Sequence, residues 1–243
     1  MKPSLPSHPP IRSTILRVSP VRSILTGAVL LGTAALASAD TKLRGNVGPR
    51  TIDDDVVIAR GTSCTLNGTT IKGNIRVQSG AKLVTNAARI TGNLQAYKAR
   101  LVDLRLVTRV NGDVQGENTR SILVRTGTRV GGSIQLKDAY APSGVDALYV
   151  KNVIVNGDVQ AEKSSGRLRV SANKIGGNLQ FVENRRGPFV ITYNRVGDDL
   201  QFFKNQGGGS IKANAVGGNL QSKENSPRPQ VKNNAVEGST ELE

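Results

Sequence analysis

The chain has 243 residues, a formal net charge of +15 and only 3% aromatic residues, with no Trp. So few large side chains argue against a globule with one bulky core, and 27 Gly favour a thin interior of Val, Ile, Leu and Ala. The only histidine is His8, near the N-terminus, and the only cysteine is Cys64. Zinc sites of the Cys/His type, Ser-His-Asp triads and Cys-His dyads are therefore excluded, and we expect no metal and no cofactor.

The first 39 residues have the three-part order of a secretory signal peptide. Basic residues up to Arg22 precede an apolar run at 24–36, and Ala37-Ser38-Ala39 offers small residues for cleavage. A membrane anchor is the alternative, but crossing the bilayer takes roughly 20 apolar residues, more than this run contains. We expect a signal peptide at 1–39, no transmembrane segment after it, and a secreted, periplasmic or cell-surface protein.

After a lead-in or cap at 40–56, we expect one solenoid domain at 57–243, because a six-residue pattern recurs there. The pattern is a β-branched residue, any residue, Gly, then Asn, Asp or Ser, an apolar residue and Gln. Its copies start at Ile71, Ile90, Val110, Val130, Val155, Ile175, Val196, Val216 and, in worn form, Val236. Leu43-Arg-Gly-Asn-Val47 is considered a further, degenerate copy.

Within each unit, apolar and polar residues alternate with a period of two, as in Leu104-Arg-Leu106. Such alternation, with Gly and Asn at the ends, is typical of short strands and tight turns. A unit of about 20 residues has no room for a helix as well. The sequence therefore predicts an all-β fold, a single-stranded parallel β-helix (β-solenoid) of about nine 20-residue coils, stacked about 4.8 Å apart.

Amides and aromatics also recur in register. Asn tolerates a left-handed conformation and can bond its own backbone or the Asn of the next coil, so we interpret the Asn columns as corner ladders. The Gln column points outward and is interpreted as a ladder, with ligand contact as the alternative. Phe181 and Phe202 are expected to stack in the core. The columns are Asn173, Asn194, Asn214 and Asn234; Asn184, Asn205 and Asn225; and Gln95, Gln115, Gln135, Gln160, Gln180, Gln201 and Gln221.

The Gly-Asn/Asp-Leu/Val-Gln coils, the corner asparagines and the Cys64-Thr-Leu-Asn-Gly-Thr-Thr segment resemble a group of secreted bacterial β-helix proteins of uncharacterised function. The resemblance covers about residues 55–241. More distantly, the coils are similar to pectate-lyase-like β-helices and to bactofilins, which polymerise end to end. These resemblances imply an architecture and carry over no catalytic residue. The Ca²⁺-binding Asp cluster of the lyases has no counterpart that we find in this chain.

The carboxylates are candidate catalytic groups, because glycan cleavage usually needs a pair of them. Asp113, Asp158 and Asp199 share one repeat position, and Asp113 and Asp158 should lie two coils, or about 10 Å, apart. Asp53-Asp54-Asp55 could bind Ca²⁺ weakly or simply be solvated. The alternative function is thus a carbohydrate-active enzyme, a lyase or glycoside hydrolase, near Asp158, Asp198 and Asp199. We name no catalytic residue.

The basic residues are more informative, because five of them precede the first β-branched residue of a unit and Ile154 interrupts the series. Stacked like charges repel each other, so such a stripe is either a solvated face or a binding surface for a polyanion. We expect the partner to be an acidic polysaccharide or another polyanion. The stripe consists of Arg89, Arg109, Arg129, Lys174 and Arg195, and Arg105 and Arg125 form a second pair in register.

The coil that starts at Val130 is longer than the others, with a loop marked by Pro142 and Gly144. Insertions in repeat proteins often carry the binding function, so Tyr140, Asp146 and Tyr149 are candidates for glycan contact, with a tolerated bulge as the alternative.

Two features bear on assembly. Cys64 lies among apolar strand residues, which favours burial over a disulfide between chains. A terminal coil without a cap leaves unpaired backbone groups, so pairing with another copy could give a homo-oligomer or a filament. We expect an exported structural or adhesive solenoid of the cell envelope or extracellular matrix.

Overall fold

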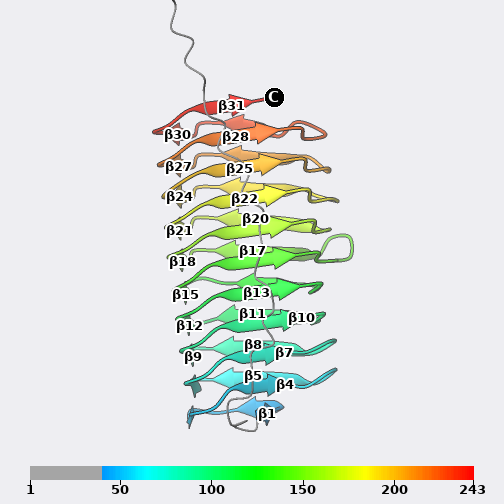
Figure 1. Cartoon of the computed structure of the whole chain (residues 1–243), viewed down its shortest axis with the longest axis vertical. Helices are drawn as coiled ribbons and strands as arrows, with labels where there is room; N and C mark the ends of the chain where they lie inside the picture. The colour runs from blue at the N-terminus through cyan, green and yellow to red at the C-terminus, as the bar shows by residue number, and fades with distance from the viewer. Residues whose placement is uncertain (1–39) are drawn as a thin grey trace, which may run out of the picture. The chain divides into compact units, whose positions relative to one another are not determined.

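The computed structural model describes residues 40–243, so the expected signal peptide lies outside the described residues. The described chain folds into 31 short strands without a helix. The strands form three parallel sheets of eleven, ten and ten strands, and each strand pairs with the one three positions further along the chain (Figure 1). This is the predicted β-solenoid, with about ten coils where the repeat pattern indicated about nine.

Each coil contributes one strand to each sheet. Sheet A contains β1 (Thr41–Leu43), β4 (Val56–Ile58), β7 (Ile75–Val77), β10 (Leu94–Tyr97), β13 (Val114–Glu117), β16 (Ile134–Lys137), β19 (Val159–Glu162), β22 (Leu179–Val182), β25 (Leu200–Phe203), β28 (Leu220–Lys223) and β31 (Thr240–Leu242). Sheet B contains β2 (Gly45–Val47), β5 (Ser63–Asn67), β8 (Lys82–Asn86), β11 (Leu101–Arg105), β14 (Ile122–Val124), β17 (Asp146–Lys151), β20 (Arg167–Ser171), β23 (Phe189–Thr192), β26 (Gly209–Lys212) and β29 (Gln230–Lys232). Sheet C contains β3 (Thr51–Ile52), β6 (Thr70–Ile71), β9 (Arg89–Ile90), β12 (Arg109–Val110), β15 (Arg129–Val130), β18 (Ile154–Val155), β21 (Lys174–Ile175), β24 (Arg195–Val196), β27 (Ala215–Val216) and β30 (Ala235–Val236).

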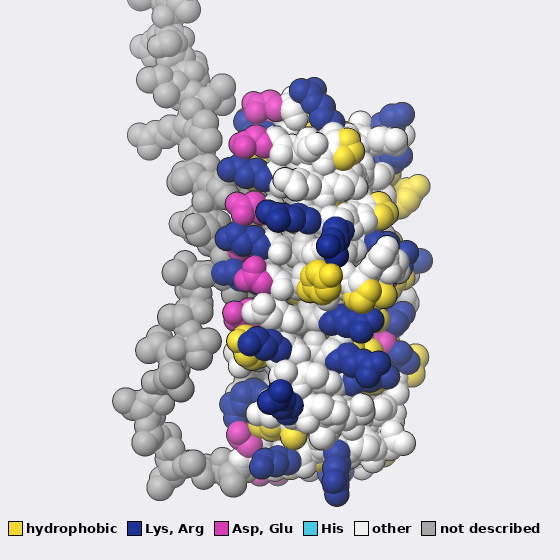
Figure 2. Space-filling model, turned by 90° about the vertical axis from the view of Figure 1, so that its right-hand side faces the viewer, with side chains coloured by type: hydrophobic (Ala, Val, Ile, Leu, Met, Phe, Trp, Pro, Cys, Tyr) yellow, Lys and Arg dark blue, Asp and Glu magenta, His cyan; other side chains and the backbone are white. Residues whose placement is uncertain are grey.

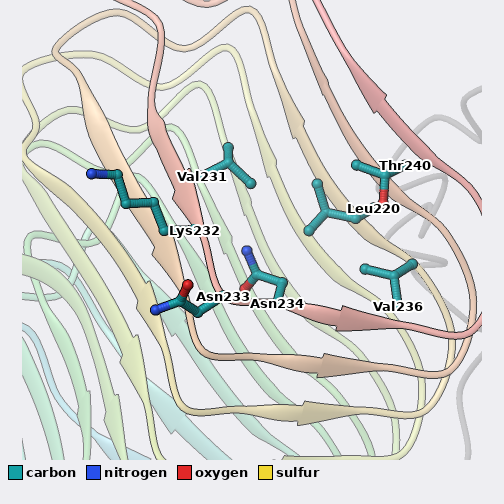
Figure 3. A pocket seen from close by; sticks show the side chains of 7 residues that line it. All are labelled: Leu220, Val231, Lys232, Asn233, Asn234, Val236 and Thr240. Atoms are coloured by element: carbon teal, nitrogen blue, oxygen red, sulfur yellow. The ribbon is translucent and has the colours of Figure 1, made fainter.

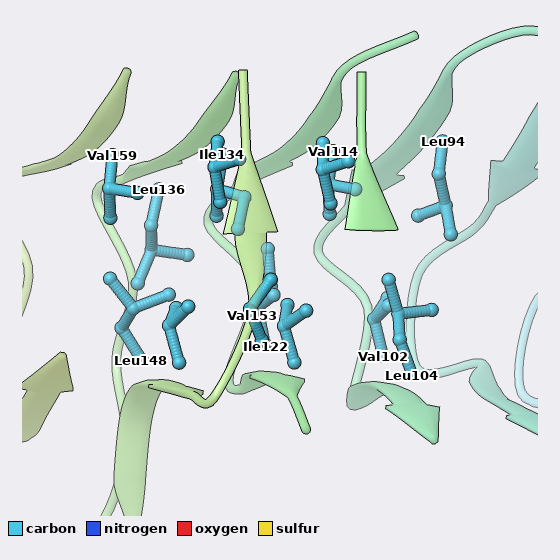
Figure 4. Close-up of a cluster of buried hydrophobic side chains, with 14 of the residues drawn as sticks. Leu94, Val102, Leu104, Val114, Ile122, Ile134, Leu136, Leu148, Val153 and Val159 are labelled. Atoms are coloured by element: carbon cyan, nitrogen blue, oxygen red, sulfur yellow. The ribbon is translucent and has the colours of Figure 1, made fainter. Parts of the chain in front are cut away.

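The core is a narrow column of aliphatic side chains between the three sheets. Because side chains alternate along a strand, every second residue faces inward, as Val114 of β13 and Ile122 of β14 do with no exposed surface. Figure 4 shows such residues from consecutive coils in line, with Leu94, Val114, Ile134 and Val159 side by side in one row. Phe181 and Phe202 are buried with ring centroids 6.2 Å apart, which confirms the predicted stacking.

The repeated Gly allows consecutive coils to approach closely at the turn from sheet C to sheet A. A Cβ added at Gly177 would overlap Oδ1 of Asp158 in the preceding coil, and one at Gly132 would overlap Oδ1 of Asp113. Gly leaves room for those oxygens, which explains why most copies of the repeat carry Gly there, although Asp54 and Asp198 occupy the position in two coils.

The first coil differs from the expectation in one detail. Leu43 lies in sheet A and Val47 in sheet B, so Leu43–Val47 is not a copy of the repeat in register. The true equivalent is Ile52-Asp-Asp-Asp-Val56, in which Ile52 pairs with Ile71 and Val56 pairs with Ile75. The three aspartates obscured this copy because they replace the Gly-Asn signature. Strands β1, β2 and β3, in the segment expected as a lead-in or cap, belong to the same three sheets.

The asparagine columns form ladders, but the left-handed conformation belongs to another residue. Ala172 (φ 57°) and Lys204 (φ 54°) are left-handed, and each directly precedes a ladder Asn. The expectation that Asn itself would take this conformation was therefore wrong. The preceding residue turns the corner, and this turn directs the following Asn into the buried interior, where its amide finds backbone partners.

Candidate functional site

Five basic side chains line up on the outer face of sheet C, and we call Arg89, Arg109, Arg129, Lys174 and Arg195 the basic column. Backbone pairing places Arg89 beside Arg109 and Arg109 beside Arg129, while Lys174 pairs with Arg195. Ile154 lies between the two groups. All five basic side chains are exposed. Adjacent members of each group are therefore separated by one strand spacing, about 4.8 Å along the sheet.

Within the part of the chain that the structure describes, no carboxylate forms an ion pair with the basic column. Among residues 40–243, the ion pairs involve other basic side chains. These lie on sheets A and B or at the corners, apart from Lys72, which pairs with Asp53. Like charges on neighbouring strands destabilise a sheet, so this column costs the fold some stability.

The opposite corner of the coil, between sheets A and B, shows what compensation looks like. Consecutive coils there carry Asp138, Lys163, Glu183, Lys204 and Glu224, which alternate in sign. A hydrogen bond to Glu162 and attraction to Glu183 and Asp138 raise the pKa of Lys163. Figure 2, which faces the side where the longer loop projects, shows acidic side chains between basic ones near its left edge. Alternation thus relieves the repulsion at this corner, whereas sheet C has no such relief.

A shallow hollow of about 220 Å³ lies in the basic column where its regular pattern breaks. Arg109 and Arg129 border it together with Asn111 and Asn156, and Gly131 leaves the space between the two asparagines empty. A Cβ at Gly131 would overlap the carbonyl oxygen of Asn111, so this position stays without a side chain. Guanidinium groups and amide donors are the groups that bind carboxylate, sulfate and phosphate oxygens.

Arg105 and Arg125, the second basic pair, lie on sheet B and face a common acidic partner. Asp103 of β11 is fully buried and accepts hydrogen bonds from Nε of Arg105 and from Nε of Arg125, each at 2.7 Å. Burial alone would raise the pKa of Asp103, but the hydrogen bonds and charges of the two arginines outweigh it and lower this pKa. The same carboxylate raises the pKa of Arg105. The structure therefore does not bring this pair together with the basic column.

The three loop candidates have separate surroundings. Tyr140 is 61% exposed and its hydroxyl accepts a hydrogen bond from Arg186 at 3.0 Å. Asp146 accepts a hydrogen bond from Nε of Arg169 at 2.8 Å. The ring of Tyr149 lies against the guanidinium of Arg169, 4.8 Å from the ring centroid. Of the three candidates, only Tyr140 presents most of its surface to solvent, and glycan contact by the loop stays a prediction.

The aspartates of the repeat support the backbone of the next coil. Oδ1 of Asp113 accepts the N–H of Ser133, Oδ1 of Asp158 accepts that of Asn178, and Oδ1 of Asp199 accepts that of Asn219, all at 2.7 Å. Asn and Ser take the same role in other coils, as Asn93 does for the N–H of Asp113. The carboxylates that the enzyme alternative would use are thus components of a structural ladder.

The glutamine column is a ladder as well. Nε2 of each Gln from Gln95 to Gln201 donates to Oε1 of the Gln in the next coil, at distances from 2.8 to 3.3 Å. This confirms the structural interpretation of the column.

The described residues contain no group of three or more His, Cys, Asp or Glu placed to hold a metal ion. Asp53 pairs with Lys72, and Asp55 accepts hydrogen bonds from the backbone and side chain of Asn74. Cys64 is buried and not in a disulfide, and burial raises its thiol pKa to about 11. A protonated, buried thiol is a poor nucleophile, so Cys64 behaves as a core residue.

A second hollow, of about 160 Å³, lies in the coil of β29, β30 and β31 (Figure 3). Val231 and Val236 line it and are half-buried, whereas Ile211 and Val216 in the coil before are buried. The hollow continues the apolar interior, and Lys232 is the only charged residue among those that line it. It therefore offers no acid–base pair.

Sequence reasoning missed the residues that surround the basic column. Asn111 and Asn156 occupy a position that is Gly in several other coils, and this irregularity was the only signal. Tyr193, which is 71% exposed, occupies a corner position that is Ala in the coils on either side. Neither position stands out until the coils are aligned in space.

Within residues 40–243, no helix is long and apolar enough to serve as a membrane span. Comparisons of this chain with family models, with curated proteins and with solved structures found no match.

Proposed function

We propose that this chain is an exported structural or adhesive β-solenoid that binds acidic polymers through the basic column. The proposal that it is exported relies on the signal-like order of residues 1–39, and the bacterial envelope or matrix setting on the resemblance to secreted bacterial β-helix proteins. The observation that carries the binding proposal is the row of exposed basic side chains on sheet C, which form no ion pair among residues 40–243.

The contrast between two surfaces supports a role in binding. At the corner between sheets A and B the charges alternate, and Lys204 pairs with Glu224 at 3.8 Å. On sheet C, three consecutive coils present Arg at the same position, although Ala215 and Ala235 demonstrate that a small neutral residue fits there. A repulsive arrangement that the fold does not need is best explained by a ligand that removes the repulsion. A polyanion does this and gains entropy from released counterions.

The spacing favours a linear polymer over a single small anion. Cationic groups recur at about 4.8 Å along the coil axis, so a chain with one negative group per repeat of similar length can meet several of them at once. One sugar unit of an extended polysaccharide advances by a comparable distance. Phosphates of B-DNA recur every 3.4 Å along one strand and would fall out of register. An acidic polysaccharide is therefore the partner that we propose.

The enzyme alternative has less support from this geometry. Asp113, Asp158 and Asp199 each hold a backbone N–H of the next coil, and Asp198 is exposed. Three of these four carboxylates are therefore engaged in the structural ladder, which counts against a catalytic role for them. Self-association end to end stays a further prediction.

The proposal is tested by replacing two stacked arginines, Arg109→Ala together with Arg129→Ala. Ala already occupies the equivalent position in two coils, so we expect the variant to fold. Each cation near an anionic surface contributes about 1 kcal/mol, so affinity for an acidic polysaccharide such as polygalacturonate should fall roughly tenfold to thirtyfold at low salt. The slope of log affinity against log salt should decrease by about one for each lost contact.

The matched control is Arg100→Ala together with Arg120→Ala. These residues are also exposed and lie on consecutive coils, but at the corner between sheets A and B. Ala81 holds the equivalent position in the coil before Arg100, so Ala is compatible with this corner. The control removes the same net charge and should keep most of the affinity and the salt slope. Equal losses in both variants would mean that the net charge, and not the basic column, determines binding.

A further inference from the structure

At the corner between sheets B and C, each coil around Tyr193 turns through a left-handed residue. Ala172 (φ 57°), Tyr193 (φ 58°) and Ala213 (φ 54°) occupy this position in three consecutive coils, and their backbones are linked by hydrogen bonds to the neighbouring coils. The left-handed region is unfavourable for a bulky side chain, and Ala or Asn serves in the other coils nearby. Tyr193 therefore places a bulkier side chain at this corner than the coils on either side do.

The fold gains little packing from Tyr193. Its side chain is 71% exposed, the largest exposed fraction among the large hydrophobic residues of the described chain. Within residues 40–243 it makes no ring contact, cation–π contact or side-chain hydrogen bond, whereas Tyr97, Tyr140 and Tyr149 each lie against a basic side chain. An exposed aromatic side chain at a left-handed corner, without a partner among the described residues, suggests a binding role.

The surroundings of Tyr193 indicate what would bind. Asn194 is buried, so Tyr193 and Arg195 lie at the outer surface on either side of it, and Lys174 is the partner of Arg195 across the sheet. Next to these two cations the surface carries no side chains, because Gly176, Gly197 and Gly217 follow each other in the column. A Cβ at any of the three would overlap a backbone oxygen of the preceding coil. The result is a strip without side chains beside two positive charges, with the exposed Tyr193 two residues before Arg195 at the adjoining corner.

We infer that Tyr193, Lys174 and Arg195 form a subsite for a sugar ring that carries a carboxylate or a sulfate. The apolar C–H face of the sugar packs against the Tyr193 ring, and its anionic group meets Arg195 and Lys174. The glycines leave room for the flat polymer to lie on the sheet. This inference relies on the proposed function, because it assumes that a polyanion follows the basic column. It adds that the polymer is recognised as a saccharide and not only as a charged chain.

The test compares two polyanions that share charge but differ in rings. Polygalacturonate presents a carboxylate on each sugar ring, and poly-glutamate presents carboxylates without any ring. The change Tyr193→Ala inserts the residue found in both neighbouring coils. It should lower the affinity for polygalacturonate roughly three- to tenfold and leave the affinity for poly-glutamate unchanged. Tyr193→Phe keeps the ring and should bind polygalacturonate like the original chain. Dextran sulfate, measured in parallel, distinguishes a sulfate from a carboxylate on the sugar.

Tyr97→Ala is the matched control, because Tyr97 is also exposed but belongs to β10 on sheet A. It should change neither affinity. If Tyr193→Ala weakens both polymers equally, or neither, the saccharide subsite is refuted while binding of polyanions to the basic column still holds. If the original chain binds neither polymer at low salt, the proposed function itself fails, and the subsite with it.

Discussion

At the scale of single residues, the most constrained acidic side chain of the described chain is Asp103. It is fully buried on the outer face of sheet B, beneath Arg105 and Arg125, whose side chains are 43% and 41% exposed. A buried carboxylate is tolerated only when hydrogen bonds replace its lost hydration, and two guanidinium groups do this here. The two arginines are thereby fixed on the sheet and serve the fold.

We predict that Asp103→Asn lowers the free energy of unfolding at pH 7 by about 2 kcal/mol. This is the range for hydrogen bonds to charged groups, and the partial exposure of both arginines keeps it from being larger. Because folding lowers the pKa of Asp103, its contribution is present above the unfolded pKa near 3.8 and is lost as the pH falls through the lower folded value. The difference between the two proteins in urea unfolding should therefore shrink from pH 5 towards pH 2.

Asp198→Asn serves as the control, because Asp198 is an exposed aspartate on the same solenoid. Its effect should stay within about 0.5 kcal/mol at all pH values. A stability difference for Asp103→Asn that does not depend on pH would contradict the assignment of an ionised Asp103.

At the scale of structural elements, the coils are linked by side-chain ladders that add to the backbone pairing of the sheets. Asn205 is buried, and its Oδ1 accepts both the N–H and the side-chain amide of Asn184, while its own amide donates to the carbonyl oxygen of Phe181 at 2.8 Å. The left-handed residue before each such Asn leaves these backbone groups without strand partners. The ladder thus satisfies polar groups that the corner would otherwise bury unpaired.

We predict that Asn205→Ala destabilises the solenoid by about 3 kcal/mol, because it leaves several buried polar groups without partners at 1–3 kcal/mol each. Gln201→Ala removes an amide from the surface ladder of the same coil, where water can replace the lost hydrogen bond at 3.2 Å to Gln221. That variant should lose less than about 1 kcal/mol. Chemical denaturation measures both, and equal losses would show that burial does not distinguish the two ladders.

At the scale of the described solenoid, stability is expected to be a sum over coils and their interfaces, because each coil touches only its neighbours. The coils are nearly equivalent, so a whole one should be removable. Deleting residues 196–215 joins Arg195 to Val216, and the chain then continues in the register of the repeat with Gly217 and Gly218.

We predict that this 20-residue deletion leaves a folded β-solenoid with a sheet-like circular dichroism spectrum. The slope of its unfolding free energy against urea concentration (the m-value) should be about one tenth smaller. One of about ten coils is missing, so less surface is exposed on unfolding. Deleting only 196–205 would bring Ser210, Ile211 and Lys212 of sheet B into sheet A and turn Ile211 outward at the position of Gln201. A cooperative, native-like unfolding transition for this half-coil deletion would contradict the shared register.

The sequence by itself determined the all-β solenoid and the alignment of the basic column. Both follow from simple periodicities, since a period of two selects the inward side chains and a period of about 20 makes sequence register a line in space. For the same reason Arg109 lies beside Arg129 and Phe181 stacks with Phe202, as predicted.

Only the tertiary structure decided which polar groups remain free to bind a ligand. Arg105 and Arg125 share the periodicity of the basic column, yet both are hydrogen-bonded to the buried Asp103. Asp158 looks like a catalytic candidate until its Oδ1 is found to accept a backbone N–H. Tyr193 is inconspicuous in the sequence and becomes notable through its exposed, left-handed corner. Periodicity specifies which residues are neighbours, whereas charge pairing and exposure depend on which way each side chain turns at a corner, and that is set by local backbone conformation and packing.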